Sequence, residues 1–471
     1  MRAAIAVLIG VRAFAAIVIL AGCASEEPTT FVDVHGLPDC ASAKLETIFT
    51  ATRSLIPKGS VTDENFVTSQ SVADPKLLLD GPQIFPAFRE VIASAKHDVN
   101  LQTYVWEPDS DPARDILGGL ADLARRRAAN GATEPVHVRF LFDVSTIGFG
   151  SQVVTLPQTW AQVEALKLDA RYVRFELAGV QRSGFGALHK KTLVVDGREA
   201  IITGANPQAH YDYDTPWRDA GYRFTGEVVL ALQDDFDATW TKGKLWTCGA
   251  AEDRELAACS VATEPIERPA EPIALASDAC LPMLVTTRVA DSNPVGNRID
   301  NPQDQTFLAA FGAATKHIRI QTPNLNDDAA KGAIVEAVKR GVRVDVVLAK
   351  GFNDSTEDYP GQGGTNEDNV VMLYDTLKAA SVADVCNKLR IRWHARGGVA
   401  IVGNGPYASH AKYASLDDEI VIVGTANQDT QSWNNSREVN VLVDDPATTK
   451  AWDGGMFLNE FAGGIVVDPC K

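Results

Sequence analysis

Two distant stretches of this 471-residue chain follow one pattern, and their repetition limits the possible fold more than any other feature does. Residues 189–197 read HKKTLVVDG and residues 410–417 read HAKYASLD, so both fit His-x-Lys-x4-Asp. Each stretch continues to a turn of small residues that ends in an asparagine, Asn206 in the first copy and Asn427 in the second. The chain has only eight histidines, so two copies in equivalent settings are not expected by chance.

The surroundings of the two stretches are repeated as well. Residues 86–103 and 307–322 both run from a helical stretch through a Lys-His pair into a strand pattern that ends in Gln-Thr. Further on, the helix and strand patterns at 329–348 match those at 111–143. An internal duplication in which strands alternate with helices predicts two similar α/β sandwich halves, each a mixed sheet flanked by helices. We expect a bilobal, pseudo-twofold monomer with its site at the interface of the halves.

Composition marks the boundaries of these halves. Residues 24 to about 45 are polar, and residues 262–278 hold three prolines among acidic and small residues, a composition typical of linkers. The expected segments are a signal peptide at 1–22, a tether at 23–45, a first half at 46–261, a linker at 262–279 and a second half at 280–471.

The N-terminus has the pattern of an export signal. Arg2 and Arg12 precede a short apolar run at 13–20, and small residues follow it. The LAG sequence before Cys23 resembles a bacterial lipoprotein box, which implies cleavage before Cys23 and lipidation of that cysteine. A plain signal peptide or a membrane anchor stays open. The expected location is the bacterial cell envelope, as a membrane-anchored lipoprotein facing the periplasm or the exterior.

An exported chain folds in an oxidising compartment, where its remaining six cysteines can pair. Cys248 and Cys259 flank a short polar stretch and are the expected first bridge. The other four allow three pairings, among which the sequence does not choose. These four are Cys40, Cys280, Cys386 and Cys470.

The formal net charge of -17 argues against a nucleic-acid partner, because nucleic acids attract basic surfaces. A locally positive pocket for a small anionic group remains compatible with an acidic surface.

Strand geometry separates the residues of each repeated stretch. Side chains alternate along a strand, so His189 and Lys191 share a face. Asp196 lies seven residues from His189, about 20 Å along a straight strand, and points to the other face. Asp196 is therefore expected to hold the hairpin turn rather than to contact the histidine. The second copy repeats this arrangement with His410, Lys412 and Asp417.

The hairpin that follows each motif sets which residues lie opposite the histidine. A two-residue turn at 197–198 places Asn206 across from His189, and the equivalent turn in the second copy places Asn427 across from His410. Each half then offers a histidine, a lysine and an asparagine in one patch.

Two such patches facing each other suit a phosphodiester. Lysine ammonium and asparagine amide groups can hold the non-bridging oxygens. One imidazole can attack phosphorus and form a phosphohistidine. The other can protonate the leaving alcohol and then deprotonate water or a second alcohol. No metal or other cofactor is required, because the lysines supply the positive charge.

The two copies resemble the paired HKD motifs of the phospholipase D superfamily. The segment that begins at Trp217 (WRDAGYRFTGEVV) and the segment 435–438 (NSRE) also resemble regions of bacterial cardiolipin synthase-like members. The resemblance implies that Asp219 and Glu438 orient the two histidines. It further implies that the first-half histidine is the nucleophile and the second-half histidine the acid.

The resemblance implies a phospholipase D-like phosphodiesterase that hydrolyses or transfers the phosphatidyl group of phospholipids. The alternatives are a cardiolipin synthase-like phosphatidyltransferase, a metal-independent nuclease and a non-catalytic phospholipid-binding protein. A monomer suffices, because one chain contains both half-sites. The expected partners are the phospholipid substrate and, through lipidated Cys23, a membrane.

Several other residues near the motifs receive a structural interpretation. His210 could line the pocket, and the loop 350–366 could be a lid or a solvated excursion. The aromatic residues are assigned to the core rather than to a binding surface; they are Trp106, Tyr211, Tyr213, Trp217 and Trp433.

Overall fold

The computed structural model describes residues 36–70, 75–144, 156–181, 185–241, 245–247, 280–291 and 298–470, and every structural statement below concerns these ranges. The expected signal peptide, Cys23, the expected linker and the Cys248–Cys259 pair lie outside them. Residues His35–Lys471 make up one compact unit. Within the described part, no helix combines the length and the apolar composition needed to cross a bilayer.

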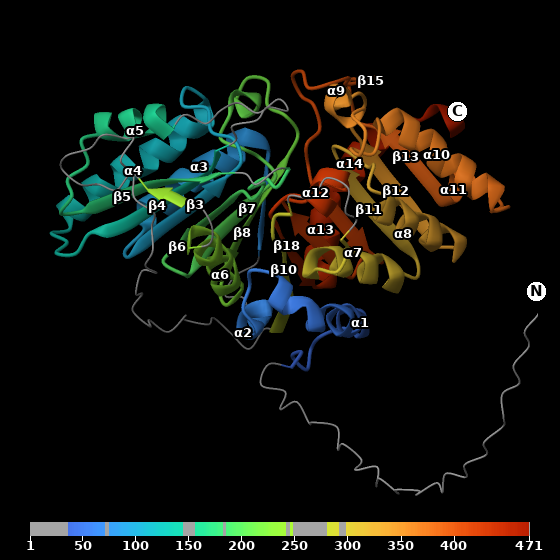
Figure 1. The fold of residues 1–471 in the computed structure, drawn as a ribbon, viewed down its shortest axis with the longest axis horizontal. Coiled ribbons are helices and arrows are strands. Elements are labelled where there is room, and N and C mark those ends of the chain that lie inside the picture. Colours follow the sequence, from blue (N-terminus) through green and yellow to red (C-terminus); the bar gives the residue numbers. More distant parts are fainter. Residues whose placement is uncertain are drawn as a thin grey trace, which may run out of the picture. The chain divides into compact units, whose positions relative to one another are not determined.

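Eight strands form the sheet of the first half (Figure 1). Strands β3, β4 and β5 run parallel to one another, and the other neighbours are antiparallel. From edge to edge the order is β2 (Lys76–Leu79), β8 (Ala220–Thr225), β7 (Glu199–Thr203), β6 (Thr192–Val195), β3 (Asp98–Thr103), β4 (Val136–Val144), β5 (Val173–Gln181) and β9 (Leu245–Thr247).

Helices cover both faces of this first sheet. Strand β4 shows the division, because successive side chains of a strand point to opposite faces. Phe140 packs into the cluster formed with three helices, whereas Leu141 packs with Phe236 and Trp240 of α6. Figure 1 shows the same arrangement, with α6 on the side away from the other three. The helices are α3 (Asp80–Ser94), α4 (Asp111–Ala129), α5 (Leu156–Ala165) and α6 (Val228–Thr241), with the short turn η2 (Ala209–Tyr211).

Nine strands form the second sheet. Their order is β1 (Val67–Gln70), β10 (Cys280–Arg288), β18 (Glu438–Asp444), β17 (Ile420–Gly424), β16 (Tyr413–Leu416), β11 (His317–Thr322), β12 (Arg343–Leu348), β13 (Leu389–Trp393) and β19 (Ile465–Val466). A separate two-stranded ribbon consists of β14 (Ala395–Arg396) and β15 (Val399–Ala400).

The helical segments of the second half lie between and after these strands (Figure 1). They are α7 (Pro302–Ala313), α8 (Asp328–Lys339), α9 (Asp354–Glu357), α10 (Asn366–Ala379), α11 (Val385–Lys388), α12 (Thr430–Asn434), α13 (Pro446–Trp452), η4 (Asp453–Phe457), α14 (Leu458–Gly463) and η5 (Asp468–Cys470).

The strand order of the two sheets confirms the duplication. Reading from β10 to β19, the second sheet repeats the order of the first from β2 to β9, element by element. In both sheets the strand after the motif histidine, β6 or β16, pairs antiparallel with the central parallel strand, β3 or β11. The α/β class expected from alternating patterns is therefore correct, and each motif precedes the equivalent strand of its sheet.

The N-terminal described segment differs from the expected boundaries. It contains α1 (Ala43–Thr52), η1 (Arg53–Lys58) and α2 (Asp63–Phe66), and it leads into β1, which pairs with β10 of the second sheet. Leu45, Ile48 and Phe49 are buried in the same core as the α7 side chains. Their i, i+3, i+4 spacing makes one apolar stripe, so α1 begins within the expected tether and packs on α7 of the second half, although residues from 46 were expected in the first half.

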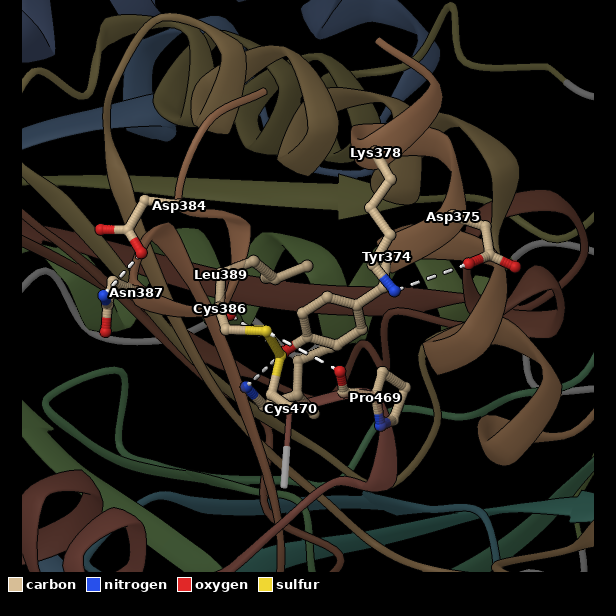
Figure 2. Close-up of a disulfide and its surroundings, with 10 residues drawn as sticks. Tyr374, Asp375, Lys378, Asp384, Cys386, Asn387, Leu389, Pro469 and Cys470 are labelled. Carbon is tan, nitrogen blue, oxygen red and sulfur yellow. Dashed lines mark hydrogen bonds and ion pairs between the residues drawn. A yellow bond between two sulfur atoms is a disulfide. The ribbon is translucent and has the colours of Figure 1, made fainter. Parts of the chain in front are cut away.

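Two disulfides join distant segments. Cys40 is bonded to Cys280, which fixes the N-terminal segment to the start of β10. Cys386 of α11 is bonded to Cys470 at the C-terminal end, as Figure 2 shows. Nearby, the Tyr374 hydroxyl donates to the Leu389 carbonyl oxygen at 2.9 Å. Of the three pairings that the sequence left open, the structure has this one.

The expected two-residue hairpin turns are wrong by one residue. Val195 pairs with Glu199, which leaves three residues in the turn, and Leu416 pairs with Ile420 in the same way. Asp196 and Gly197 both have positive φ, 56° and 63°, as the central residues of a type I′ turn require, and Arg198 is the additional residue of the loop. Continued past the strand ends, the observed register would put Ala205, not Asn206, across from His189.

Candidate active site

The chain segments that enter the two motifs are bound to the opposite half by backbone hydrogen bonds. The N–H of His189 donates to the Arg437 carbonyl oxygen at 3.1 Å, next to Glu438. The N–H of His410 donates to the Arg218 carbonyl oxygen at 2.8 Å, next to Asp219. Each histidine is thus held beside an acidic residue that belongs to the other half.

The side chains complete this crossed arrangement. Nδ1 of His189 lies 2.7 Å from Oε1 of Glu438, and Nδ1 of His410 lies 2.9 Å from Oδ2 of Asp219. Both acids are fully buried, at 0% exposure, so each acts on its histidine without competition from water. With Nδ1 held by an acid, Nε2 of each imidazole is the nitrogen left for a substrate.

The motif lysines lie beside the histidines. Nζ of Lys191 donates to the His189 carbonyl oxygen at 2.5 Å, and Nζ of Lys412 donates to the His410 carbonyl oxygen. Burial lowers the pKa of Lys191 to about 7 and that of Lys412 to about 8, although Glu438 and Asp219 raise both. Lys412 also lowers the pKa of Lys191 by charge repulsion, which shows that the two motifs converge on one site.

Burial shifts the pKa of the two buried acids upward, opposite to its effect on the lysines. Burial raises the pKa of Glu438 to about 7, against the opposing effect of Lys191. Burial also raises the pKa of Asp219, and Lys412 opposes this shift. Two buried ammonium groups and two buried carboxyl groups therefore share one low-dielectric region, where a bound phosphate would favour the charged lysines.

Aromatic rings enclose His410. Trp217 lies 5.4 Å from its ring centroid and Phe352, from the loop 350–366, lies 5.7 Å away. The His210 ring stacks on Trp217, with 4.0 Å between the ring centroids, so His210 supports the ring that contacts His410. Tyr211 was assigned to the core, and its ring is buried, but its hydroxyl lies 2.7 Å from both Asp219 and His410. Sequence reasoning missed this contact.

The two motif asparagines do not pair with the histidines that the expected hairpin register placed opposite them. Oδ1 of Asn206 accepts a hydrogen bond from the Val105 N–H at 3.2 Å. Nδ2 of Asn427 donates to Asp429 at 2.7 Å, and Asp429 caps α12 by accepting from the Ser432 N–H. Both asparagines are buried near the motifs, and these bonds order the loops that follow the hairpins.

The motif aspartates hold the turns, as strand geometry predicts. The Asp196 carboxylate accepts from the backbone N–H groups of the three residues 96–98, at 2.7–2.9 Å for the shortest bond of each. Asp417 accepts in the same way from residues 315–317 and also pairs with Lys44. Each aspartate therefore fastens its hairpin to the loop before the central strand.

The sequence of the chain is similar to those of known proteins. Residues 307–455, which contain the second motif and Glu438, match a family model described as "Cardiolipin synthase, PLD-like domain". Cardiolipin synthase A of Pseudomonas entomophila is 27% identical over 387 residues, which cover 79% of this chain. Cardiolipin synthase 1 of Bacillus anthracis is 24% identical over 377 residues, 77% of this chain and 62% of its own length. Residues 307–455 thus match a phospholipase D-like family, and the chain as a whole is similar to cardiolipin synthases.

A likeness in fold to a solved structure extends over both halves. The crystal structure of phosphatidylserine synthase from Haemophilus influenzae superposes with a TM-score of 0.62 over 89% of this chain and 92% of that one, at 15% identity. The chain spans 65% of the length of the Pseudomonas entomophila relative. In the described ranges, no group of three or more His, Cys, Asp or Glu side chains is arranged to hold a metal ion.

One basic residue of the first motif faces away from the site. Lys190 is fully buried and pairs with Asp235 of α6, which also accepts from the Ser60 hydroxyl. Removing one partner of a buried ion pair leaves an uncompensated charge, so this pair ties the motif strand to α6. The first stretch therefore needs two lysines for two different purposes.

The structural role of Asp196 in this site can be tested by substitution. We expect Asp196→Ala to lower the free energy of unfolding by about 2–4 kcal/mol, because three backbone N–H groups lose their acceptor. Well below the melting temperature, kcat per folded molecule should stay within about threefold of wild type. The measurement is denaturant unfolding combined with phosphodiesterase assays. A large loss of kcat at unchanged stability would instead make Asp196 part of the chemistry.

Proposed function

We propose that the chain is an enzyme that transfers the phosphatidyl group of a phospholipid through a phosphohistidine intermediate. The observation that carries this proposal is the pair of crossed histidine–acid contacts, with both motif lysines buried beside them. One half supplies a nucleophile and the other an acid, which a two-step displacement at phosphorus requires.

In the first step, Nε2 of His189 attacks phosphorus. A P–N bond forms while the P–O bond to the leaving alcohol breaks, and that oxygen takes a proton from His410. In the second step, His410 takes a proton from water or a second alcohol, whose oxygen displaces His189 from phosphorus. Glu438 and Asp219 hold the two Nδ1–H groups throughout, so the reacting nitrogens keep their direction.

Lys191 and Lys412 bind the non-bridging oxygens of the substrate in this proposal. Both ammonium groups are desolvated, so their attraction for developing negative charge is stronger than in water. The residue assignments His189, Lys191, His410 and Lys412 are thus functional, whereas Asp196, Asn206, Asp417 and Asn427 support the loops that carry them.

Transfer to an alcohol is favoured over hydrolysis. The similar proteins named above are a cardiolipin synthase A, a cardiolipin synthase 1 and, by fold, a phosphatidylserine synthase. Each of these names describes a synthase. We further propose that Cys23 is lipidated and anchors the chain at the envelope membrane, which would bring the site to its lipid substrate.

The decisive experiment uses purified protein with phosphatidylcholine, phosphatidylglycerol and DNA, each with a chelator present. Cardiolipin formed from phosphatidylglycerol supports a synthase, and phosphatidic acid supports a hydrolase. Cleavage of DNA alone contradicts the lipid proposal. Loss of every activity on chelation contradicts a mechanism in which lysines supply the positive charge.

The buried lysines predict a pH dependence. Below pH 7 both ammonium groups are charged, and as the pH rises through about 7 for Lys191 and about 8 for Lys412 the charge is lost. We expect kcat/KM to decline over this interval, because kcat/KM reports ionisations of the free enzyme. A bound phosphate raises both pKa values, so kcat should decline at higher pH than kcat/KM does.

The Lys191→Arg variant tests whether the loss of charge on Lys191 causes this decline. Lys191→Arg keeps a positive charge at every pH of the assay, so the lower step of the decline should disappear. A kcat/KM profile that is flat from pH 7 to 9 in the wild type would contradict lysine binding of the phosphate.

A further inference from the structure

The two histidine–acid pairs are held by hydroxyl groups at equivalent places. Tyr211 and Ser432 each stand five positions after the asparagine that ends their motif, Asn206 or Asn427. The Tyr211 hydroxyl donates to Oδ2 of Asp219 at 2.7 Å, and the Ser432 hydroxyl donates to Oε1 of Glu438 at 2.8 Å. In both half-sites the hydroxyl bonds the same carboxylate oxygen that contacts Nδ1 of the histidine.

The two hydroxyls differ in their reach. The phenol oxygen of Tyr211 lies 2.7 Å from Nδ1 of His410. This distance is shorter than the 2.9 Å between Nδ1 and Oδ2 of Asp219. The structure has the Ser432 hydroxyl on Glu438, and it also accepts from the Asn427 N–H. Both acids are therefore shared with a hydroxyl group, and the Tyr211 phenol also contacts Nδ1 of the histidine that its acid serves.

One set of proton positions satisfies these contacts. The phenol O–H donates to Asp219. The Nδ1–H of His410 donates a bifurcated hydrogen bond to the phenol oxygen and to Oδ2 of Asp219. Lys412 also lies 2.9 Å from Nδ1, and in this arrangement its ammonium directs an N–H at the His410 carbonyl oxygen rather than at Nδ1. Nε2 of His410 then faces the substrate.

We infer that Tyr211 is a positioning residue that shares the Asp219 carboxylate with His410 and so lets this histidine release its proton to a leaving alcohol more readily than it would without the phenol. The inference rests on the proposed function, in which His410 is the acid. A carboxylate that already accepts a phenol proton stabilises an imidazolium less than an unshared carboxylate does. The acid of the reaction must lose and regain its proton in each cycle, so weaker stabilisation of the imidazolium serves it.

The other charges around His410 act in the same direction. Burial lowers its pKa well below the ordinary value, and four further groups lower it by repulsion. These are Lys412 from the same segment before β16, Lys191 and His189 of the first motif, and His210 from η2. Asp219 is the acid in contact with the ring, so what Tyr211 does to this carboxylate bears directly on the proton of His410.

The test is Tyr211→Phe, which removes one oxygen and keeps the buried ring. Histidine labelled with ¹³C at Cε1 gives a direct NMR titration, and the His410 signal is assigned by its loss in His410→Asn. We expect the imidazole pKa of His410 to rise by about half a unit to one unit in Tyr211→Phe. This readout needs no activity, so it tests the inference even if the proposed function fails.

A kinetic comparison adds a second readout. Transfer from a phospholipid, whose alcohol leaves poorly, should slow roughly 10-fold in Tyr211→Phe. Cleavage of bis(p-nitrophenyl) phosphate should change little, because p-nitrophenolate leaves without a proton. Absence of both reactions in the wild type would contradict the proposed function instead.

Tyr222→Phe is the matched control. Tyr222 of β8 is equally buried, and its hydroxyl has no hydrogen-bond partner in the described structure. This variant should match the wild type in both measurements. An unchanged His410 titration in Tyr211→Phe, or equal losses with the lipid and the aryl substrate, would overturn the inference.

Discussion

Replacing His189 by asparagine is expected to abolish the phosphohistidine intermediate and to lower kcat by roughly 10⁴-fold or more, as removal of a catalytic nucleophile does elsewhere. Asparagine has no nitrogen lone pair that can attack phosphorus. The contact of Nδ1 with Glu438 at 2.7 Å leaves Nε2 as the attacking atom, and asparagine cannot replace it. Trapping of ³²P from labelled substrate in rapidly quenched protein measures the intermediate directly.

His410→Asn should give the complementary result. The intermediate should still form from bis(p-nitrophenyl) phosphate, whose leaving group needs no proton, and should then accumulate because its hydrolysis lacks a base. His137→Asn, on β4, is a control expected to behave as wild type. Label trapped in His189→Asn but not in His410→Asn would reverse the two roles.

Glu438→Gln is expected to lower kcat by about 10²–10⁴-fold, although Glu438 belongs to the half that does not contain His189. The glutamine amide has the size of the carboxyl group but cannot stabilise the imidazolium, and it can present an N–H where Nδ1 needs an acceptor. Thr425 and Ser432 donate to the carboxyl group of Glu438, so a glutamine amide also meets donors there. Circular dichroism and thermal unfolding check that the variant remains folded.

A double-mutant cycle separates crossed from uncrossed pairing. In the crossed arrangement, Glu438→Gln has little further effect once His189 is asparagine, because both changes remove the same function. Asp219→Asn should instead be redundant with His410→Asn, and bis(p-nitrophenyl) phosphate should bypass only its effect on formation of the intermediate. Independent, multiplicative losses for Glu438→Gln and His189→Asn would contradict the contact seen between them.

Much of the fold follows from patterns along the chain. Repeated helix and strand periodicity predicts the two equivalent sheets, because each half obeys the same local rules. The alternation of side chains also separates His189 from Asp196 correctly. The one-residue error in the hairpins arose because a turn of three residues, with Asp196 in the left-handed region, reads in sequence like the commoner turn of two.

The pairing of each acid with the histidine of the other half, and the contact of Tyr211 with this site, could not be predicted from the sequence. Sequence position suggests which acid follows which motif, but the backbone pairing of His189 with Arg437 joins residues from different halves. No local rule encodes such a long-range bond. A buried tyrosine likewise reads as core, and only its spacing after Asn206, which Ser432 repeats after Asn427, marks Tyr211 as special. Residues 46–49 were assigned to the first half, because nothing local in the sequence shows that the apolar stripe of α1 packs with α7 of the second half.

The exchange of acids has a consequence for how such a chain can arise and change. A gene for one repeat could encode a working site only as a symmetric homodimer, in which each copy lends its acid to the other. Fusion of two such genes removes the need for symmetry, and the two copies can then diverge. They have done so here: an aspartate with a tyrosine serves one histidine, and a glutamate with a serine serves the other. Neither repeat can be lost, because each carries a part that only the other uses.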